Sequence, residues 1–178
     1  MLLQKGCIQV YTGNGKGKTT AAVGQGVRAA GRGLKVYMVQ FLKGSDSGEL
    51  HSLKKLEPDF KVFRFERPRG FFWTLTDEEK LELKKDIEKG FDFCKEVVKN
   101  KECDVLIIDE MMGVLGNKLL EVNEVVEFLK SKPENMEIIL TGRNVPEEIL
   151  EIADLVTEMK DIKHYFNNGV PARKGIEF

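Results

Sequence analysis

A glycine-rich stretch near the N-terminus constrains the fold of this chain more than any other feature. It reads Thr12-Gly13-Asn14-Gly15-Lys16-Gly17-Lys18-Thr19-Thr20 and stands between a short apolar run (residues 7–11) and a helical pattern (residues 21–30). A strand, a glycine turn, Lys-Thr and a helix, in this order, form the context of a phosphate-binding P-loop. Glycines let successive backbone N–H groups face one anion, and the helix adds the positive end of its dipole. A solvated turn would not require the strand and the helix on its two sides.

The loop is one residue shorter than the usual G-x-x-x-x-G-K-[ST] spacing. Counting back from Gly17-Lys18-Thr19 puts Thr12 where the first glycine belongs, and the glycine stands at position 13 instead. A shorter loop closes more tightly, so we expect the triphosphate to lie in it differently from the usual arrangement. Lys18 should still reach phosphate oxygens, and the Thr19 hydroxyl should bind Mg²⁺.

Composition excludes several classes of protein. The 178 residues suffice for one domain with a sizeable core, so we treat residues 1–178 as a single P-loop domain. The net charge of -1 gives no general attraction to nucleic acid or to an anionic membrane. The three cysteines form no C-x-x-C pair, which favours reduced thiols and a cytoplasmic location. There is no signal peptide and no long apolar span.

Apolar runs alternate with helical patterns along the rest of the chain. This alternation predicts an α/β, three-layer P-loop NTPase (RecA-like) fold with a mostly parallel central sheet. The expected strands after the first are 35–41, 60–65, 104–110, 137–143 and 155–159. The expected helices are a short one around 50–56, a long one that follows the capping box at 76–79, one over 121–130 and one from Pro146 to 153, before a polar C-terminal segment (163–178).

The C-terminal ends of parallel strands meet at one edge of a sheet, and ligands bind beyond that edge. The P-loop, the segment after Phe41, the pair Asp109-Glu110 and Arg143 should therefore converge. A buried strand that ends in two carboxylates resembles a Walker B strand, whose acids position Mg²⁺ beside the phosphates. Which of the two acids binds the metal directly stays open. Arg143 could meet phosphate or remain a surface cation.

Residues 66–75 form an unusual segment. Pro68 and Gly70 indicate a loop, yet Phe71, Phe72 and Trp73 follow each other within it. The aromatics could plug the core or, with the neighbouring arginines, stack on single-stranded nucleic acid, although the neutral charge balance disfavours the second role.

Together these motifs resemble the P-loop type ATP:cob(I)alamin (corrinoid) adenosyltransferase family. The matching stretches span almost the whole chain in order: 12–20, Val39-Gln40-Phe41-Leu42-Lys43-Gly44, Gly70-Phe71-Phe72-Trp73, Ile108-Asp109-Glu110, Leu140-Thr141-Gly142-Arg143 and Gly175-Ile176-Glu177-Phe178. The short P-loop and the aromatic segment are the specific parts of this match.

The resemblance implies a reaction in which Co(I) of a reduced corrinoid attacks the 5′ carbon of ATP, giving the 5′-deoxyadenosyl corrinoid and inorganic triphosphate, in cobalamin synthesis or salvage. The ribose 5′ carbon must then face the corrinoid pocket, so we hypothesise that the triphosphate runs through the short loop in the reversed sense. The aromatic segment would provide an apolar, water-excluding surface under the ring, which favours cobalt without a lower ligand and eases its reduction.

The resemblance also implies the site residues. The catalytic residues are Lys18, Phe71 and Trp73; Phe71, Phe72 and Trp73 bind the corrinoid; and Thr19, Asp109 and Glu110 hold Mg²⁺ or Mn²⁺. ATP is bound by Gly13, Asn14, Gly15, Lys16, Gly17, Lys18, Thr19, Thr20 and Arg143. Arg143 could instead meet the corrinoid. The implied partners are ATP, the reduced corrinoid, an electron-donating reductase and a second copy in a homodimer, without nucleic acid or membrane.

The sequence departs from the family pattern near both ends. Members often carry an N-terminal extension that covers the site, whereas this sequence begins almost at its first strand, so we expect another segment to close the site or the site to be more open. Tyr165 and Arg173 stand where the pattern predicts Pro and Gln. Arg28 could be structural, and His164 could approach a ligand, although a histidine in such a position is more often structural.

Two other functions remain as alternatives. A small P-loop nucleoside or nucleotide kinase would release ADP, but an arginine-rich lid is not evident in the sequence. The second is non-enzymatic, an ATP-dependent regulator or a RecA-like module that binds a partner or DNA, and the near-zero net charge disfavours DNA.

Overall fold

The computed structural model describes residues 3–178 and contains a six-stranded sheet whose described pairings are all parallel. The spatial order is β3-β2-β4-β5-β1-β6. The strands are β1 (Ile8–Thr12), β2 (Val36–Gln40), β3 (Phe60–Phe63), β4 (Val105–Asp109), β5 (Glu137–Thr141) and β6 (Leu155–Glu158). From β1 the chain crosses β5 and β4 to reach β2 and β3, and it then returns through β4 and β5 toward β6. Parallel sheets bind ligands beyond the strand ends where the chain reverses its direction across the sheet in this way.

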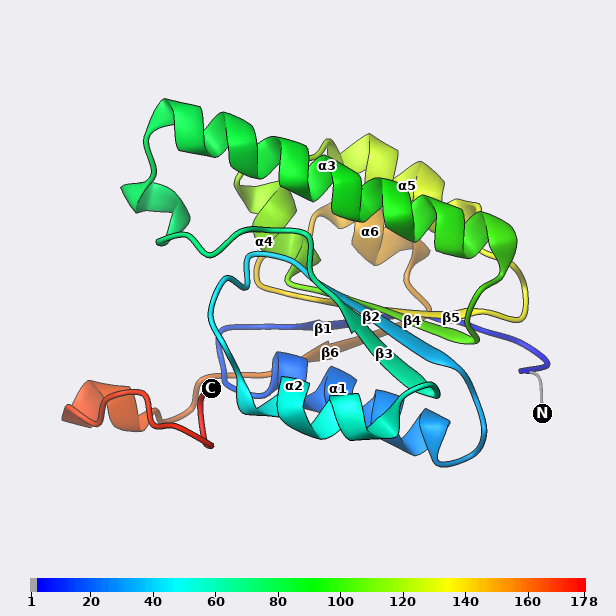
Figure 1. Ribbon diagram of the computed structural model, residues 1–178, viewed down its shortest axis with the longest axis horizontal. Helices are drawn as coiled ribbons and strands as arrows, with labels where there is room; N and C mark the ends of the chain where they lie inside the picture. The colour runs from blue at the N-terminus through cyan, green and yellow to red at the C-terminus, as the bar shows by residue number, and fades with distance from the viewer. Residues whose placement is uncertain (1–2) are drawn as a thin grey trace.

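Helices cover both faces of the sheet (Figure 1). The helices α1 (Lys18–Ala30) and α2 (Gly48–Leu53) lie on one face, and α3 (Asp77–Asn100), α4 (Met111–Gly116), α5 (Val122–Lys130) and α6 (Glu147–Ile152) lie on the other. Short 3-10 turns occupy Lys54–Leu56, Phe72–Thr74 and Tyr165–Asn168. The predicted three-layer α/β fold with a parallel sheet is confirmed.

Each face of the sheet has its own hydrophobic core. On the α1 face the packing is close enough to require glycine, since a Cβ at Gly26 would lie 2.5 Å from Cε1 of Phe60 and 3.0 Å from Cδ1 of Ile107. On the other face α3 contributes Leu83, Ile87, Phe91 and Cys94, all buried. The predicted capping box starts this helix: the Glu79 N–H donates to Thr76 Oγ1 at 3.2 Å, and Thr76 N–H donates to Glu79 Oε2 at 2.8 Å.

Some predicted elements differ from the observed ones. The third strand ends at Phe63 rather than residue 65, because its partner β2 ends at Gln40 and the Arg64 side chain donates to Gln40 Oε1 at 2.8 Å. Helix α4 was not predicted: it is short, contains two glycines and begins after Glu110, whose φ is 62°. Pro146 is the N-cap of α6 rather than a residue of its first turn.

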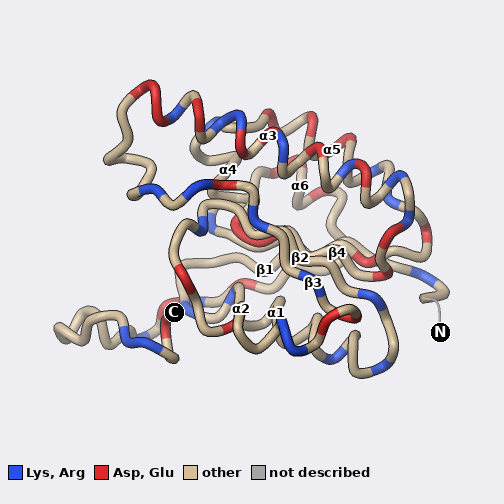
Figure 2. The backbone as a smooth tube through the Cα atoms, in the orientation of Figure 1, with Lys and Arg blue, Asp and Glu red and all other residues tan. Residues whose placement is uncertain are grey.

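Positive and negative side chains are interspersed along α3 and α5 (Figure 2). Among residues 3–178, no helix is both long and apolar enough to cross a membrane.

Candidate active site

The phosphate loop follows β1 and ends at the first residue of α1. Gly13 has φ 100° and Gly17, the N-cap of α1, has φ 118°, so both adopt a backbone conformation that favours glycine. A Cβ at Gly13 would also lie 2.3 Å from the Met159 carbonyl oxygen, and the Gly15 N–H donates to that same oxygen at 2.7 Å. The segment after β6 therefore supports the loop from behind.

Lys18 is directed into the loop. Its Nζ donates to the carbonyl oxygens of Gly13 at 2.8 Å and Gly15 at 2.9 Å. Burial lowers the pKa of Lys18, and the nearby Arg143 cation lowers it further, whereas Glu110 and Asp109 at the end of β4 oppose this shift. The ammonium thus lies at the centre of the loop, where a phosphate contact requires it.

Asp109 is the hub of a polar network at the end of β4. Its side chain is fully buried, and its Oδ1 accepts hydrogen bonds from Thr19 Oγ1 at 2.9 Å and Thr141 Oγ1 at 2.6 Å. Its Oδ2 accepts a longer bond of 3.4 Å from Gln40 Nε2 and lies 3.7 Å from Lys43 Nζ. Residues from α1 and from the ends or exits of β2, β4 and β5 therefore converge on one carboxylate, as the parallel topology predicts.

Glu110 turns away from this network. Its left-handed backbone (φ 62°) redirects the chain into α4, and its N–H donates to Thr141 Oγ1 at 2.8 Å. Burial raises the pKa of Glu110, with the neighbouring Asp109 charge acting in the same direction. The two acids are adjacent in sequence but have different surroundings, and Thr19 donates its hydroxyl hydrogen bond to Asp109 rather than to Glu110.

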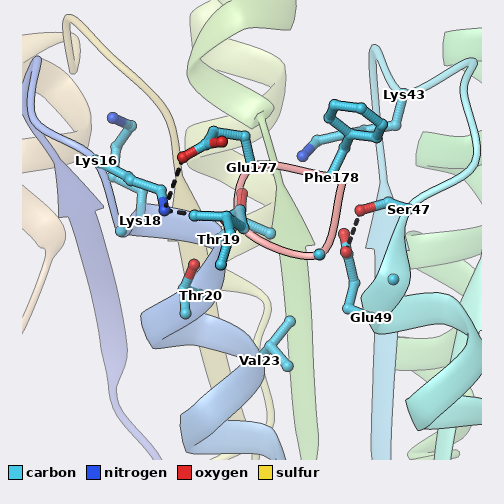
Figure 3. A pocket seen from close by; sticks show the side chains of 14 residues that line it. Lys16, Lys18, Thr19, Thr20, Val23, Lys43, Ser47, Glu49, Glu177 and Phe178 are labelled. Carbon is cyan, nitrogen blue, oxygen red and sulfur yellow. Dashed lines mark hydrogen bonds and ion pairs between the residues drawn. The ribbon is translucent and has the colours of Figure 1, made fainter. Parts of the chain in front are cut away.

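A cavity of about 340 Å³ opens beside the phosphate loop (Figure 3). Its walls come from the loop and the start of α1, from Lys43 and the start of α2, and from the last four residues of the chain. The lining residues are Lys16, Gly17, Lys18, Thr19, Thr20, Val23, Lys43, Ser47, Gly48, Glu49, Gly175, Ile176, Glu177 and Phe178.

A second cavity, of about 510 Å³, adjoins the aromatic segment. Its walls include Phe71, Phe72, Trp73 and Glu110. Lys43 lines both cavities, so the two spaces meet at this residue.

The three aromatic residues divide into two groups. The rings of Phe71 and Trp73 stack at 4.7 Å with an interplanar angle of 3°, and they are 69% and 76% exposed. Phe72 is half-buried and packs against the core on the α3 face while still lining the second cavity. The segment is therefore anchored by its middle ring and presents a flat, stacked aromatic surface to solvent.

Several residues of the site were not singled out from the sequence. Arg64 donates to Gln40 and to the Ser45 carbonyl oxygen at 2.6 Å, which ties β3 to the loop after β2. Glu66 accepts from the Leu42 N–H at 2.7 Å, and burial raises the pKa of its carboxyl to about 7. No motif identifies these side chains, because their partners lie at the end of β2 and in the loop after it, 19 to 24 residues away in the sequence.

The remaining predicted residues occupy more peripheral positions. Asn14 and Thr20 are exposed, and Thr20 lines the first cavity. Arg143 is exposed and lines neither cavity, although its charge acts on Lys18 and Glu110. His164 lies at the start of the C-terminal 3-10 turn, where its Nδ1 accepts from the Phe166 N–H at 3.1 Å.

Within residues 3–178, no group of three or more His, Cys, Asp or Glu side chains is placed to hold a metal ion. The oxygen atoms of Thr19 and Asp109, 2.9 Å apart, nevertheless suit Mg²⁺, which commonly takes one or two protein ligands and fills its remaining positions with water and phosphate oxygens.

Comparison with known proteins identifies the chemistry that this arrangement resembles. The family model of the ATP:corrinoid adenosyltransferases BtuR/CobO/CobP matches residues 4–178. A corrinoid adenosyltransferase of Sinorhizobium is 38% identical over 180 residues, covering 98% of this chain and 81% of that protein. The corrinoid adenosyltransferase of Escherichia coli K12 is 37% identical over 176 residues, covering 98% and 87% of the two chains.

Solved structures with a similar fold are more distant. The flagellar accessory protein FlaH of Methanocaldococcus jannaschii superposes with a TM-score of 0.56 at 18% identity, covering 88% of this chain and 72% of that one. A KaiC-like protein of Pyrococcus horikoshii gives a TM-score of 0.52 at 19% identity, covering 88% and 73%. These likenesses support the P-loop fold and nothing further.

Proposed function

The chain belongs to the ATP:corrinoid adenosyltransferase family, and from this premise we propose how its two cavities divide the reaction. The family's reaction transfers the 5′-deoxyadenosyl group of ATP to a corrinoid. The cavity beside the phosphate loop takes the triphosphate, and the cavity beside Phe71 and Trp73 takes the corrinoid. The observation that carries this assignment is their meeting at Lys43, because the 5′ carbon must pass from one substrate to the other.

The chemical step needs few groups of the protein. Co(I) supplies an electron pair to the ribose 5′ carbon, a Co–C bond forms, the C5′–O bond breaks, and inorganic triphosphate leaves with the bonding electrons. The protein therefore holds the two reactants in line and stabilises the departing anion.

Lys18 and Lys16 carry out that stabilisation in this proposal. Lys18 lies at the centre of the loop, and Lys16 lies on its rim with its side chain 43% exposed. The backbone N–H groups from Gly13 to Gly17 and the start of α1 add partial positive charge. Lys43, 31% exposed between the cavities, is placed to meet the phosphate that bears the 5′ oxygen.

Thr19 and Asp109 would hold Mg²⁺, or Mn²⁺ in its place, since their oxygen atoms suit a hard cation. When bound, the ion would offset negative charge on the triphosphate. Glu110 lines the aromatic cavity instead, so we assign the direct metal contact to Asp109.

Phe71 and Trp73 provide the apolar surface that the corrinoid covers. Their stacked rings form a flat apolar surface that suits a flat macrocycle, and their ring carbons offer the cobalt no lower ligand. Phe72 contributes by fixing the segment to the core.

We further propose that the triphosphate lies in the loop in the reversed sense, with its 5′ end toward Lys43. The short loop and the position of the aromatic cavity support this orientation. A nucleotide-bound crystal structure tests it: a terminal phosphate that faces the aromatic cavity would contradict it.

Other elements of the proposal rest on the resemblance or on composition. They are a homodimer, a reductase that delivers the electron for Co(II), a role in cobalamin synthesis or salvage, and a cytoplasmic location, for which the free thiols of Cys7, Cys94 and Cys103 give support.

The experiment is an anaerobic assay with ATP, Mg²⁺ and chemically reduced cob(I)alamin. The corrinoid spectrum and the phosphate product are followed together, with Lys18→Ala as the control for the phosphate loop. We expect adenosylcobalamin and triphosphate in equal amounts. Formation of ADP with another acceptor, without a corrinoid change, would favour the kinase alternative.

A further inference from the structure

The last four residues of the chain form one wall of the phosphate cavity. Figure 3 shows this segment crossing the cavity between the phosphate loop and Ser47–Glu49, with the Glu177 side chain directed toward the loop. The Lys16 Nζ donates to the Ile176 carbonyl oxygen at 3.0 Å and lies 3.5 Å from Glu177 Oε1. A lysine of the phosphate loop is thus already engaged by two acceptors of the C-terminal segment.

The Glu177 carboxylate is held from its other side. The Arg173 N–H donates to Glu177 Oε2 at 2.6 Å, and Arg173 Nη2 donates to Oε1 at 3.2 Å. The Tyr165 hydroxyl also donates to Oε1, and the Arg173 guanidinium lies 4.8 Å from the centre of the Tyr165 ring. The side chain of Glu177 is only 17% exposed as a result.

Tyr165 and Arg173 are the two positions at which the sequence departs from the family pattern, where Pro and Gln were expected. Proline has no hydroxyl, and glutamine has no charge. The resemblance therefore does not account for the contacts of Tyr165 and Arg173 with Glu177, which we call the clamp.

The clamp keeps Glu177 negatively charged. Hydrogen bonds from Arg173 and Tyr165 lower the pKa of this carboxyl to about 2, so it is ionised at every pH at which the protein would work. A triphosphate that binds the loop also needs the Lys16 ammonium, and it brings several negative charges close to Glu177.

We propose that Glu177 is an internal anion that competes with the triphosphate of ATP, and with the triphosphate product, for Lys16. The inference rests on the proposed binding of triphosphate at this loop. Binding of either ligand exchanges the Glu177–Lys16 contact for a phosphate contact, and return of Glu177 helps the product to leave. Since triphosphate is released at the loop that binds ATP, a built-in competitor weakens the binding of both anions.

The test measures the binding of inorganic triphosphate by calorimetry, using Glu177→Gln, which keeps the shape and removes the charge. We expect its dissociation constant to fall about threefold to fivefold, the scale of one partly exposed ion pair. Deletion of residues 175–178 should act in the same direction. Arg173→Gln, which restores the expected family residue, should give a smaller decrease.

Two controls separate a local contact from a general change of charge. Glu127→Gln on α5, an exposed residue on the opposite face of the sheet from the loop, removes the same charge and should leave binding unchanged. In a Lys16→Met background, Glu177→Gln should no longer tighten binding, because the group for which it competes is gone.

The outcomes distinguish the assignment of the loop as the triphosphate site from the inference that Glu177 competes for Lys16. If Glu177→Gln weakens triphosphate binding or leaves it unchanged while the protein still adenosylates cobalamin, Glu177 supports Lys16 or is neutral, and only the inference about the C-terminal segment fails. If the folded wild-type protein binds no triphosphate, the assignment of the loop and this inference both fail.

Discussion

Substitution of Trp73 by alanine tests the assignment of the aromatic segment most directly. The Trp73 ring contacts Phe71 on one face and is otherwise 76% exposed. Its removal should therefore cost the folded protein little, since an exposed aromatic pair contributes about 0.5–1.5 kcal/mol. For a chain of 178 residues, we expect the melting temperature to fall by no more than about 6 °C.

The expected loss of corrinoid binding is larger. A tryptophan side chain offers up to about 250 Å², so 76% exposure leaves roughly 190 Å² that a ligand could cover. If the corrinoid covers about half of that surface, it buries about 95 Å², which contributes about 2.4 kcal/mol at about 25 cal/mol per Å². Trp73→Ala should therefore weaken corrinoid binding about 50-fold.

The assay compares two forms of the corrinoid under anaerobic conditions. With cob(II)alamin and an excess of reductant, the reaction depends on binding and on the apolar surface that eases reduction. With cob(I)alamin prepared in advance, only binding is affected. We expect the variant to lose more activity with cob(II)alamin than with cob(I)alamin, while ATP binding stays within about twofold of wild type because Trp73 does not line the phosphate cavity.

Phe166→Ala is the matched control, because Phe166 is 69% exposed, as Phe71 is, but lies in the C-terminal 3-10 turn. It should leave both reactions unchanged. Equal losses of ATP and corrinoid affinity in Trp73→Ala, or the same activity loss in Phe166→Ala, would refute the reasoning.

Three further substitutions test other parts of the structure. In Asp109→Asn, Mg²⁺ should no longer tighten the binding of ATP, because an amide oxygen carries no charge. Calorimetry of ATP binding with and without Mg²⁺ measures this. If Mg²⁺ still tightened binding, the metal would have to be assigned to another residue. Burial raises the pKa of Glu66 to about 7, so its contribution to the free energy of unfolding is present below pH 4.5 and is lost as the pH rises through 7. The free energy of unfolding of Glu66→Gln should therefore rise by about 1–2 kcal/mol relative to that of the wild type between pH 5 and pH 8. Chemical denaturation at both pH values measures this, and a constant difference between the two proteins would contradict it. Gly26→Ala should destabilise the protein by about 1–3 kcal/mol because its Cβ would clash with Phe60. Gly24→Ala on the same helix has open space around it and should stabilise the protein by about 0.5–1 kcal/mol. Equal melting temperatures of the two variants would show that the core rearranges to accept the Cβ at position 26.

Most of the fold followed from local patterns because most of its strands and helices are encoded locally. Continuous apolar runs mark buried parallel strands, and the order of strand, glycine turn and helix fixes the phosphate loop near Gly13–Thr19. The convergence of the acidic strand end with the loop then follows from topology alone, and the bond from Thr19 Oγ1 to Asp109 Oδ1 agrees with it. Helix α4 could not be predicted in this way, because it is short, contains glycines and shows no hydrophobic periodicity.

The polar contacts of the site could not be read in the same way. The bond between Thr141 and Asp109 joins residues 32 positions apart, and Lys16 meets Ile176 across 160 positions. Periodicity reports which face of a strand or helix is buried, but it carries no information about which polar side chains meet at the edge of the sheet.

In the C-terminal segment, two residues that depart from the family pattern have a structural role that the sequence did not reveal. From sequence, Tyr165 and Arg173 were only unexpected residues in a polar tail. In the structure both bind one carboxylate, and that carboxylate lies beside a lysine of the phosphate loop. Two residues that separately look neutral thus hold a single anionic group, Glu177, and its position beside the loop is the reason to expect that they act on ATP and triphosphate together.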